Sequence, residues 1–197
     1  MHSKLLLATC LCCAIPAVAQ TSPYAGQEAR PIKALSEQEV AQLRAGEGMG
    51  LAKAAELNGY PGPSHVLELA DRLGLSGQQR QATESLMRAH KARARELGEL
   101  VIAAEKELDD AFAQKRIDAA ALSALTAKAA QAHARLREEH LRTHLEQARL
   151  LTPAQVRHYV VLRGYAKGTP GAPPEHRHGD DHRGHGHEDR HGHGTRR

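Results

Sequence analysis

Seven histidines crowd the last thirty residues of the sequence, among carboxylates and glycines. They are His176, His178, His182, His185, His187, His191 and His193. Imidazole nitrogen is a ligand for Zn, Ni and Cu, and neighbouring Asp and Glu side chains complete such sites. The composition therefore favours divalent metal binding by this tail. The alternative is a solubilising, pH-responsive tail, because histidine gains its proton at about pH 6.5.

His187 and His191 also belong to a His-Glu-x-x-His pentad, the pattern of zinc proteases. That chemistry requires the pentad on a buried helix, whereas here it stands among glycines without apolar periodicity. His140 and His144 form a second pair, four residues apart in a stretch of helical periodicity, so their rings share one helix face. This pair is a candidate ligand set for one divalent ion, with Glu139 or a residue from the facing helix as a third donor. Alternatively, both rings lie at the edge of an apolar stripe, hydrogen-bonded or solvated.

No group of residues forms a recognisable catalytic site, although His65 and His90 are further candidate metal donors. The glycine-rich stretch 46–50 lacks the preceding strand and the following Lys-Ser/Thr of a phosphate loop, which favours a hinge. The formal net charge of +4 is not gathered in one basic patch, so nucleic acid is not an expected partner. The sequence predicts a binding protein and not an enzyme.

The first nineteen residues have the pattern of an export signal. Lys4 gives a positive start, an apolar run follows, and Ala17-Val18-Ala19 fits the small-x-small cleavage site. The run is too short to predict stable membrane insertion. The three cysteines, Cys10, Cys12 and Cys13, all lie inside this segment. We therefore expect a mature, cysteine-free periplasmic chain that begins at Gln20, without disulfides or thiolate metal sites.

The mature chain is predicted to be all-α, because Ala, Leu, Glu, Gln, Arg and Lys dominate its middle. We expect a flexible lead with short helices over 20–63, a helical domain over 64–167 and a disordered tail over 168–197. Capping residues and apolar periodicity place helices at 36–46, 51–56, 65–73, 77–116, 118–150 and 152–164, with Ser64 as the N-cap of the third.

The link between the two long helices is very short, so they should fold back as an antiparallel α-hairpin. Aromatic residues make up only 3% of the sequence, and the apolar stripes are narrow and rich in alanine. Such a hairpin buries little area against a conformational entropy cost of roughly 1–2 kcal/mol per residue. We therefore expect the elongated hairpin to form a homodimer.

The sequence contains one internal repeat of the form Leu-Ser/Thr-x-x-Gln. Its copies are Leu75, Ser76 and Gln79, and Leu151, Thr152 and Gln155. In each copy the hydroxyl should cap a helix, the glutamine should close the capping box and the leucine should pack inward. The two copies flank a long α-hairpin in an exported chain without cysteine.

This arrangement resembles the Spy/CpxP family of periplasmic stress proteins, which includes zinc-resistance-associated proteins and periplasmic heavy-metal sensors. The resemblance covers about residues 64–166. It implies a cradle-like homodimer that binds unfolded or misfolded envelope proteins without ATP. The His-rich tail lies outside the resemblance, and its composition is the reason to expect that it binds divalent metal (Zn, Ni or Cu). The alternative that the resemblance implies is a heavy-metal sensor or metal-resistance buffer without chaperone activity. Such a protein would regulate a two-component sensor kinase or a sigma-factor system.

Overall fold

The computed structural model describes residues 22–166, and within this part of the chain every regular element is a helix. The all-α prediction is thereby confirmed. The elements are α1 (Glu37–Ala45), α2 (Lys53–Glu56), α3 (Pro63–Glu68), α4 (Gly77–Ala113), α5 (Ala119–Leu150) and α6 (Pro153–Leu162). The predicted export signal, the first two residues of the predicted mature chain and the seven tail histidines lie outside the described residues.

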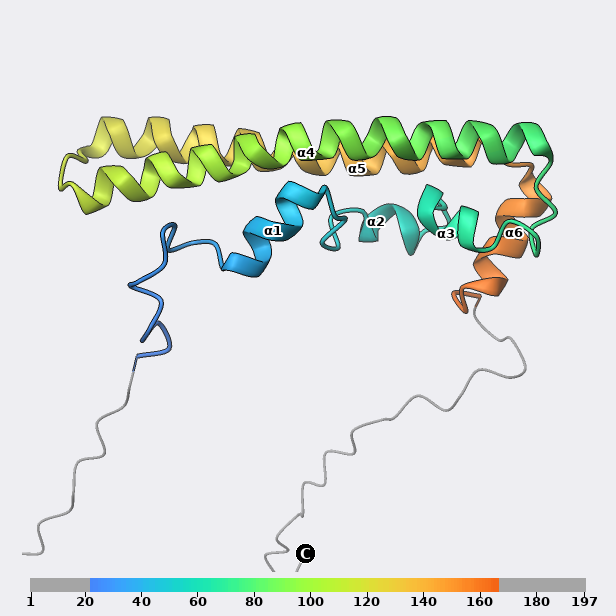
Figure 1. Cartoon of the computed structure of the whole chain (residues 1–197), viewed down its shortest axis with the longest axis horizontal. Helices are drawn as coiled ribbons and strands as arrows, with labels where there is room; N and C mark the ends of the chain where they lie inside the picture. Colours follow the sequence, from blue (N-terminus) through green and yellow to red (C-terminus); the bar gives the residue numbers. More distant parts are fainter. Residues whose placement is uncertain (1–21, 167–197) are drawn as a thin grey trace, which may run out of the picture.

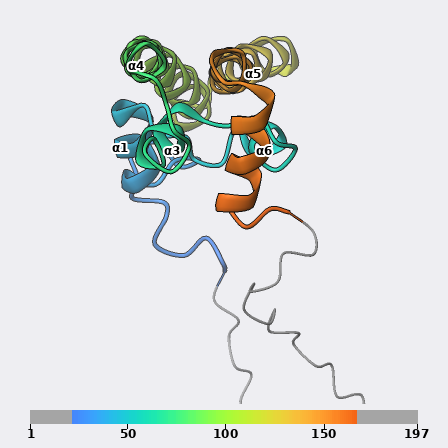
Figure 2. The same ribbon diagram turned by 90° about the vertical axis from the view of Figure 1, so that its right-hand side faces the viewer.

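The two long helices, α4 and α5, run side by side in opposite directions along the length of the molecule (Figure 1). The 37 residues of α4 correspond to about 55 Å at 1.5 Å per residue. α1, α2 and α3 follow one another along one side of this pair, and α6 turns away from the end of α5. Viewed from the end, α1 and α3 lie beneath α4 and α6 beneath α5 (Figure 2).

Local capping explains where most of the helices begin. Ser36, Ser76 and Thr152 each accept a hydrogen bond from the backbone N–H three residues on, in a complete capping box. Asp118 caps α5 by accepting from the N–H of Ala121 at 2.8 Å. These four predicted N-caps are confirmed, because each side chain satisfies a backbone donor that the helix itself leaves free.

The prediction that Ser64 caps the third helix is wrong. The N-cap is Gly62, and Pro63 occupies the first turn, where its fixed φ and missing N–H cost nothing. Ser64 instead lies inside the helix, with its hydroxyl 3.3 Å from Glu68 Oε1. α3 is also shorter than the predicted 65–73, because the chain continues from Leu69 through successive turns to Gly74, which has φ 61°.

Two further boundaries differ from the prediction. α4 ends at Ala113 and not near 116, because Lys115 has a left-handed φ of 53° and the chain turns there towards α5. α2 begins at Lys53 instead of 51, because Gly50, with φ 75°, and the turn after it occupy those positions.

The main hydrophobic core lies between the long helices and the N-terminal segment. Eleven buried side chains form it: Ile32, Leu35, Leu43, Ala94, Leu97, Val101, Ile102, Ala104, Ala129, Ala132 and Leu136. Three of them come from the segment before residue 46, which was expected to be a flexible lead. The N-terminal segment therefore supplies large apolar side chains to a pair of helices that contribute many alanines.

α1 can approach α4 this closely only because residue 98 is glycine. A Cβ at Gly98 would stand 2.4 Å from the carbonyl oxygen of Leu43, in the backbone of α1. We expect Gly98→Ala to lower the free energy of unfolding by about 1–3 kcal/mol, because α1 must shift and Leu43 then leaves the core. Urea unfolding followed by circular dichroism measures this loss.

Gly77→Ala is the matched control, since a Cβ at Gly77 meets nothing within 4 Å at the start of the same helix. Its stability should be unchanged or slightly higher, because alanine has the better helix propensity. Equal stabilities of the two variants would contradict a role for the close approach of α1.

Candidate functional site

A cavity of about 450 Å³ lies where the N-terminal segment meets α4 and α5. The glycine-rich stretch 46–50, α2 and the start of α3 line one side, and the first half of α4 and the second half of α5 line the other. Four histidines line it: His65, His90, His140 and His144. Because these imidazoles come from three separate helices, the cavity is the place where the described residues concentrate titratable and metal-ligating side chains.

His140 is the most buried of the four rings, at 4% exposure. Its ring meets that of His90 edge to face, with centroids 4.7 Å apart. Its Nε2 atom is buried and has no hydrogen-bond partner. Burial, followed by the neighbouring His90, His144 and Lys91, lowers the pKa of His140 from 6.5 to about 4. His140 is therefore neutral at physiological pH.

His90 is held by the neighbouring turn of α5. Its Nδ1 lies 3.1 Å from Glu139 Oε1 and 2.9 Å from the hydroxyl of Thr143. The Thr143 hydroxyl donates to the carbonyl oxygen of Glu139 at 3.0 Å, so it can accept from His90. The Nδ1–H tautomer satisfies all these contacts together. Glu139, predicted as a third ligand beside His140 and His144, instead orients His90.

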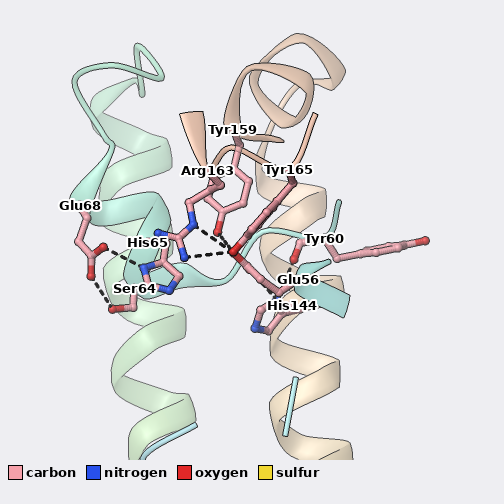
Figure 3. Close-up of polar contacts among 9 residues, drawn as sticks. All are labelled: Glu56, Tyr60, Ser64, His65, Glu68, His144, Tyr159, Arg163 and Tyr165. Atoms are coloured by element: carbon pink, nitrogen blue, oxygen red, sulfur yellow. Dashed lines mark hydrogen bonds and ion pairs between the residues drawn. The ribbon is translucent and has the colours of Figure 1, made fainter. Parts of the chain in front are cut away.

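His144 and His65 face the cavity from opposite sides and are fixed in a similar way (Figure 3). His144 Nδ1 lies 2.8 Å from the carbonyl oxygen of Tyr60, and His65 Nδ1 lies 2.8 Å from Glu68 Oε2. Gly62 gives His144 room, because a Cβ there would stand 2.8 Å from the ring. The glycine-proline turn thus positions both rings.

Glu56 joins the cavity to the C-terminal helix (Figure 3). Its Oε1 accepts hydrogen bonds from Tyr159 at 2.5 Å and from Tyr165 at 3.2 Å, and it forms an ion pair with Arg163 at 3.4 Å. Burial, followed by the hydrogen bond to Glu56, raises the pKa of Tyr159 far above its ordinary value, so its hydroxyl remains a donor. This contact ties α2 to α6.

The structure brings His140 and His144 to one cavity, together with His65 and His90. Within residues 22–166, however, no three His, Cys, Asp or Glu side chains are grouped so that they could hold a metal ion. Sequence reasoning missed Met49, Met87 and Glu56, which also line the cavity. Glu56 gives no signal in the sequence. The two methionines give a weak one, because they are the only methionines after the initiator.

The two copies of the Leu-Ser/Thr-x-x-Gln repeat meet in space. Gln79 donates to Gln155 Oε1 at 2.8 Å, Gln155 donates to Gln79 Oε1 at 3.0 Å, and Gln79 also donates to the carbonyl oxygen of Leu150 at 2.9 Å. Each glutamine also accepts from the N-cap of its own helix. Leu151 is buried against Tyr159, and Leu75 packs partly buried beside the same cluster. The repeat therefore joins the start of α4 to the start of α6.

No family model, curated protein or solved structure matches this chain. The helices of residues 22–166 include none that is both long and apolar enough to cross a membrane.

Proposed function

We propose that the chain is an exported stress protein of the Spy/CpxP type, which holds unfolded envelope proteins without ATP. In this proposal it acts in the periplasm as a binding protein, without an enzymatic reaction. The observation that carries it is the exposure of large apolar side chains on the long helices. Phe112, the only phenylalanine of the chain, is 54% exposed in the last turn of α4, and Leu122, in the first turn of α5, is 41% exposed.

The position of these side chains supports a holding role. The end of the α4–α5 pair projects beyond α1, so no other described helix covers it (Figure 1). Leu100 and Leu145 add exposed apolar area further along the same two helices. Apolar surface that the protein leaves in water is available to apolar segments of an unfolded chain. The paired glutamines of the repeat support the resemblance on which the family assignment rests.

The proposal includes a homodimer and a metal-binding tail. α4 and α5 form a single layer, and their alanine-rich contact leaves much of the surface away from α1–α3 uncovered (Figure 2). A second copy is the simplest cover for part of it. The seven tail histidines would bind Zn, Ni or Cu through their imidazole nitrogens. This would make the holding activity responsive to metal.

Aggregation of a chemically denatured client, followed by light scattering, tests the holding role. We expect suppression at stoichiometric ratios without nucleotide. Phe112→Glu combined with Leu122→Glu should weaken it about thirtyfold, because two apolar contacts of about 1 kcal/mol each are lost. Ala113→Glu combined with Ser123→Glu is the matched control, since it adds the same charge at adjacent exposed positions. No suppression by the unmodified protein would contradict the proposal.

The alternative function is a heavy-metal sensor or buffer that regulates a two-component sensor kinase or a sigma-factor system. The cavity with four histidines favours it, because a sensor needs ligands within its folded part. The same assay separates the two functions. A holding protein suppresses aggregation in the presence of a chelator, whereas a sensor without chaperone activity does not suppress it at all.

A further inference from the structure

The cavity combines imidazole with thioether. The chain has three methionines, and the two beyond Met1, Met49 and Met87, both line it. Met49 is also one of two non-glycine residues with a left-handed backbone in the described part of the chain, at φ 44° between Gly48 and Gly50. That conformation costs a side-chain-bearing residue roughly 1 kcal/mol or more. Met49 therefore stands at the cavity wall in a backbone conformation that glycine would adopt more easily.

Three of the imidazoles have one nitrogen fixed and the other free. The Nδ1 atoms of His65, His90 and His144 each face an oxygen, at 2.8 Å, 3.1 Å and 2.8 Å. An Nδ1–H that donates to oxygen leaves a lone pair on Nε2. Ligating histidines are typically held by such contacts, which set the tautomer and the ring orientation. In the described structure, no hydrogen bond engages Nε2 of these three rings.

The charges of the cavity distinguish between cations. Two acidic side chains, Glu47 and Glu56, and two basic ones, Lys53 and Lys91, line it. Their formal charges cancel, so the cavity offers no net negative charge to a divalent ion. No three His or carboxylate side chains of residues 22–166 are grouped for a shared ion. A site of neutral donors with few ligands suits a soft monovalent cation, and thioether sulfur selects for Cu(I) among the biological metals.

We propose that this cavity binds Cu(I), and its analogue Ag(I), through the sulfurs of Met49 and Met87 and Nε2 of His65, His90 or His144. The proposal deepens the metal-binding part of the proposed function and is independent of the His-rich tail. Binding would pull the glycine-rich stretch 46–50 and α3 towards α4 and α5, so the ion would tighten the N-terminal segment onto the long helices.

The experiment uses the exported and processed chain, labelled with [methyl-¹³C]methionine and titrated with Ag(I). The processed chain should give two methyl signals, which Met49→Leu and Met87→Leu assign. We expect both signals to shift with a common midpoint. The tail contains no methionine, so metal taken up there does not shift these signals.

His144→Gln should weaken this titration by at least about tenfold, because it removes a ligand while keeping the polarity of the side chain. His65→Gln and His90→Gln test the other two candidate donors in the same titration. His133→Gln is the control, since His133 lies outside the cavity with its Nε2 2.8 Å from Glu105 Oε1. Circular dichroism verifies that each variant folds.

Two outcomes would overturn the proposal. Methyl signals that stay unmoved by excess Ag(I) exclude the thioethers, and equal midpoints in all histidine variants exclude the imidazoles. Zn(II) binding measured by calorimetry on the processed chain and on the same chain truncated after residue 168 reports the tail by difference. Unmoved methyl signals together with Zn(II) uptake would reject the cavity site and leave the metal-binding tail intact.

Discussion

Tyr159→Ala is expected to lower the free energy of unfolding by about 3–5 kcal/mol, the range for loss of a fully buried aromatic side chain. Tyr159 has no exposed surface, and it packs with Val66, Leu73 and Leu151. Its hydroxyl is also the closest donor to Glu56, at 2.5 Å. The alanine variant therefore loses the packing of α6 against this cluster. It also leaves the Glu56 carboxylate with only its longer contacts to Arg163 and Tyr165.

Tyr159→Phe separates the two contributions, since it keeps the packing and removes only the donor. We expect it to cost about 1.5–3 kcal/mol, as for a hydrogen bond to a charged group. Tyr60→Ala is the control, because the side chain of Tyr60 is 43% exposed and only its backbone carbonyl contacts His144. Urea unfolding gives all three values, and equal losses for Tyr159→Ala and Tyr60→Ala would refute the anchoring role of Tyr159.

Acidification should destabilise the fold between about pH 6.5 and pH 4, through the charging of His140. Its pKa is about 4 in the folded protein, below the ordinary value of 6.5, because the ring is buried beside His90, His144 and Lys91. The unfolded chain therefore takes up this proton before the folded chain does. The contribution of the neutral His140 ring to the free energy of unfolding is therefore fully present above about pH 6.5. It is lost as the pH falls towards 4, by an amount on the order of 3 kcal/mol.

His140→Leu should abolish most of this loss, because leucine has no proton to gain. His158→Leu is the control, since His158 is exposed on α6 and should keep the pH dependence of the unmodified protein. Both variants share the carboxylates Glu39 and Glu68, whose lowered pKa values add a loss at more acidic pH that cancels in the comparison. Urea midpoints measured across this pH range test the prediction. An equal change of midpoint with pH in the two variants would contradict the role of His140.

Much of the helical architecture could be predicted from local sequence. Ser36, Ser76 and Thr152 are predicted as N-caps because a Glu or Gln three residues on closes a capping box, whereas Asp118 is predicted without such a partner. Ser64 misled the same reasoning, since the Gly62-Pro63 pair before it already begins the helix. Local sequence gives no reason for Gly98 within α4, because the residue that requires a glycine there, Leu43, is far away in sequence.

The candidate site could be predicted only in part. The spacing of His140 and His144 places both on one face of a helix, and the sequence also indicates His65 and His90 as candidate donors. Nothing local indicates that the glycine-rich stretch and α3 would bring Met49 and His65 to the same cavity. Nor does local sequence indicate that Glu56 meets Tyr159, since the two are separated by more than a hundred residues. Such contacts depend on tertiary packing.

Hydrogen bonds between the side-chain amides of Gln79 and Gln155 join α4 to α6, and Gln79 also donates to the carbonyl oxygen of Leu150 in α5, so the long helices are fastened at the end where the repeat lies. At the opposite end, the last turn of α4 and the first turn of α5 have neither a clasp of this kind nor a covering element (Figure 1). Local opening costs least where few buried contacts resist it. We therefore expect α4 and α5 to separate locally at this end while they stay packed at the repeat. A large segment of another chain could then enter between the separated turns without unfolding the rest of the helix pair.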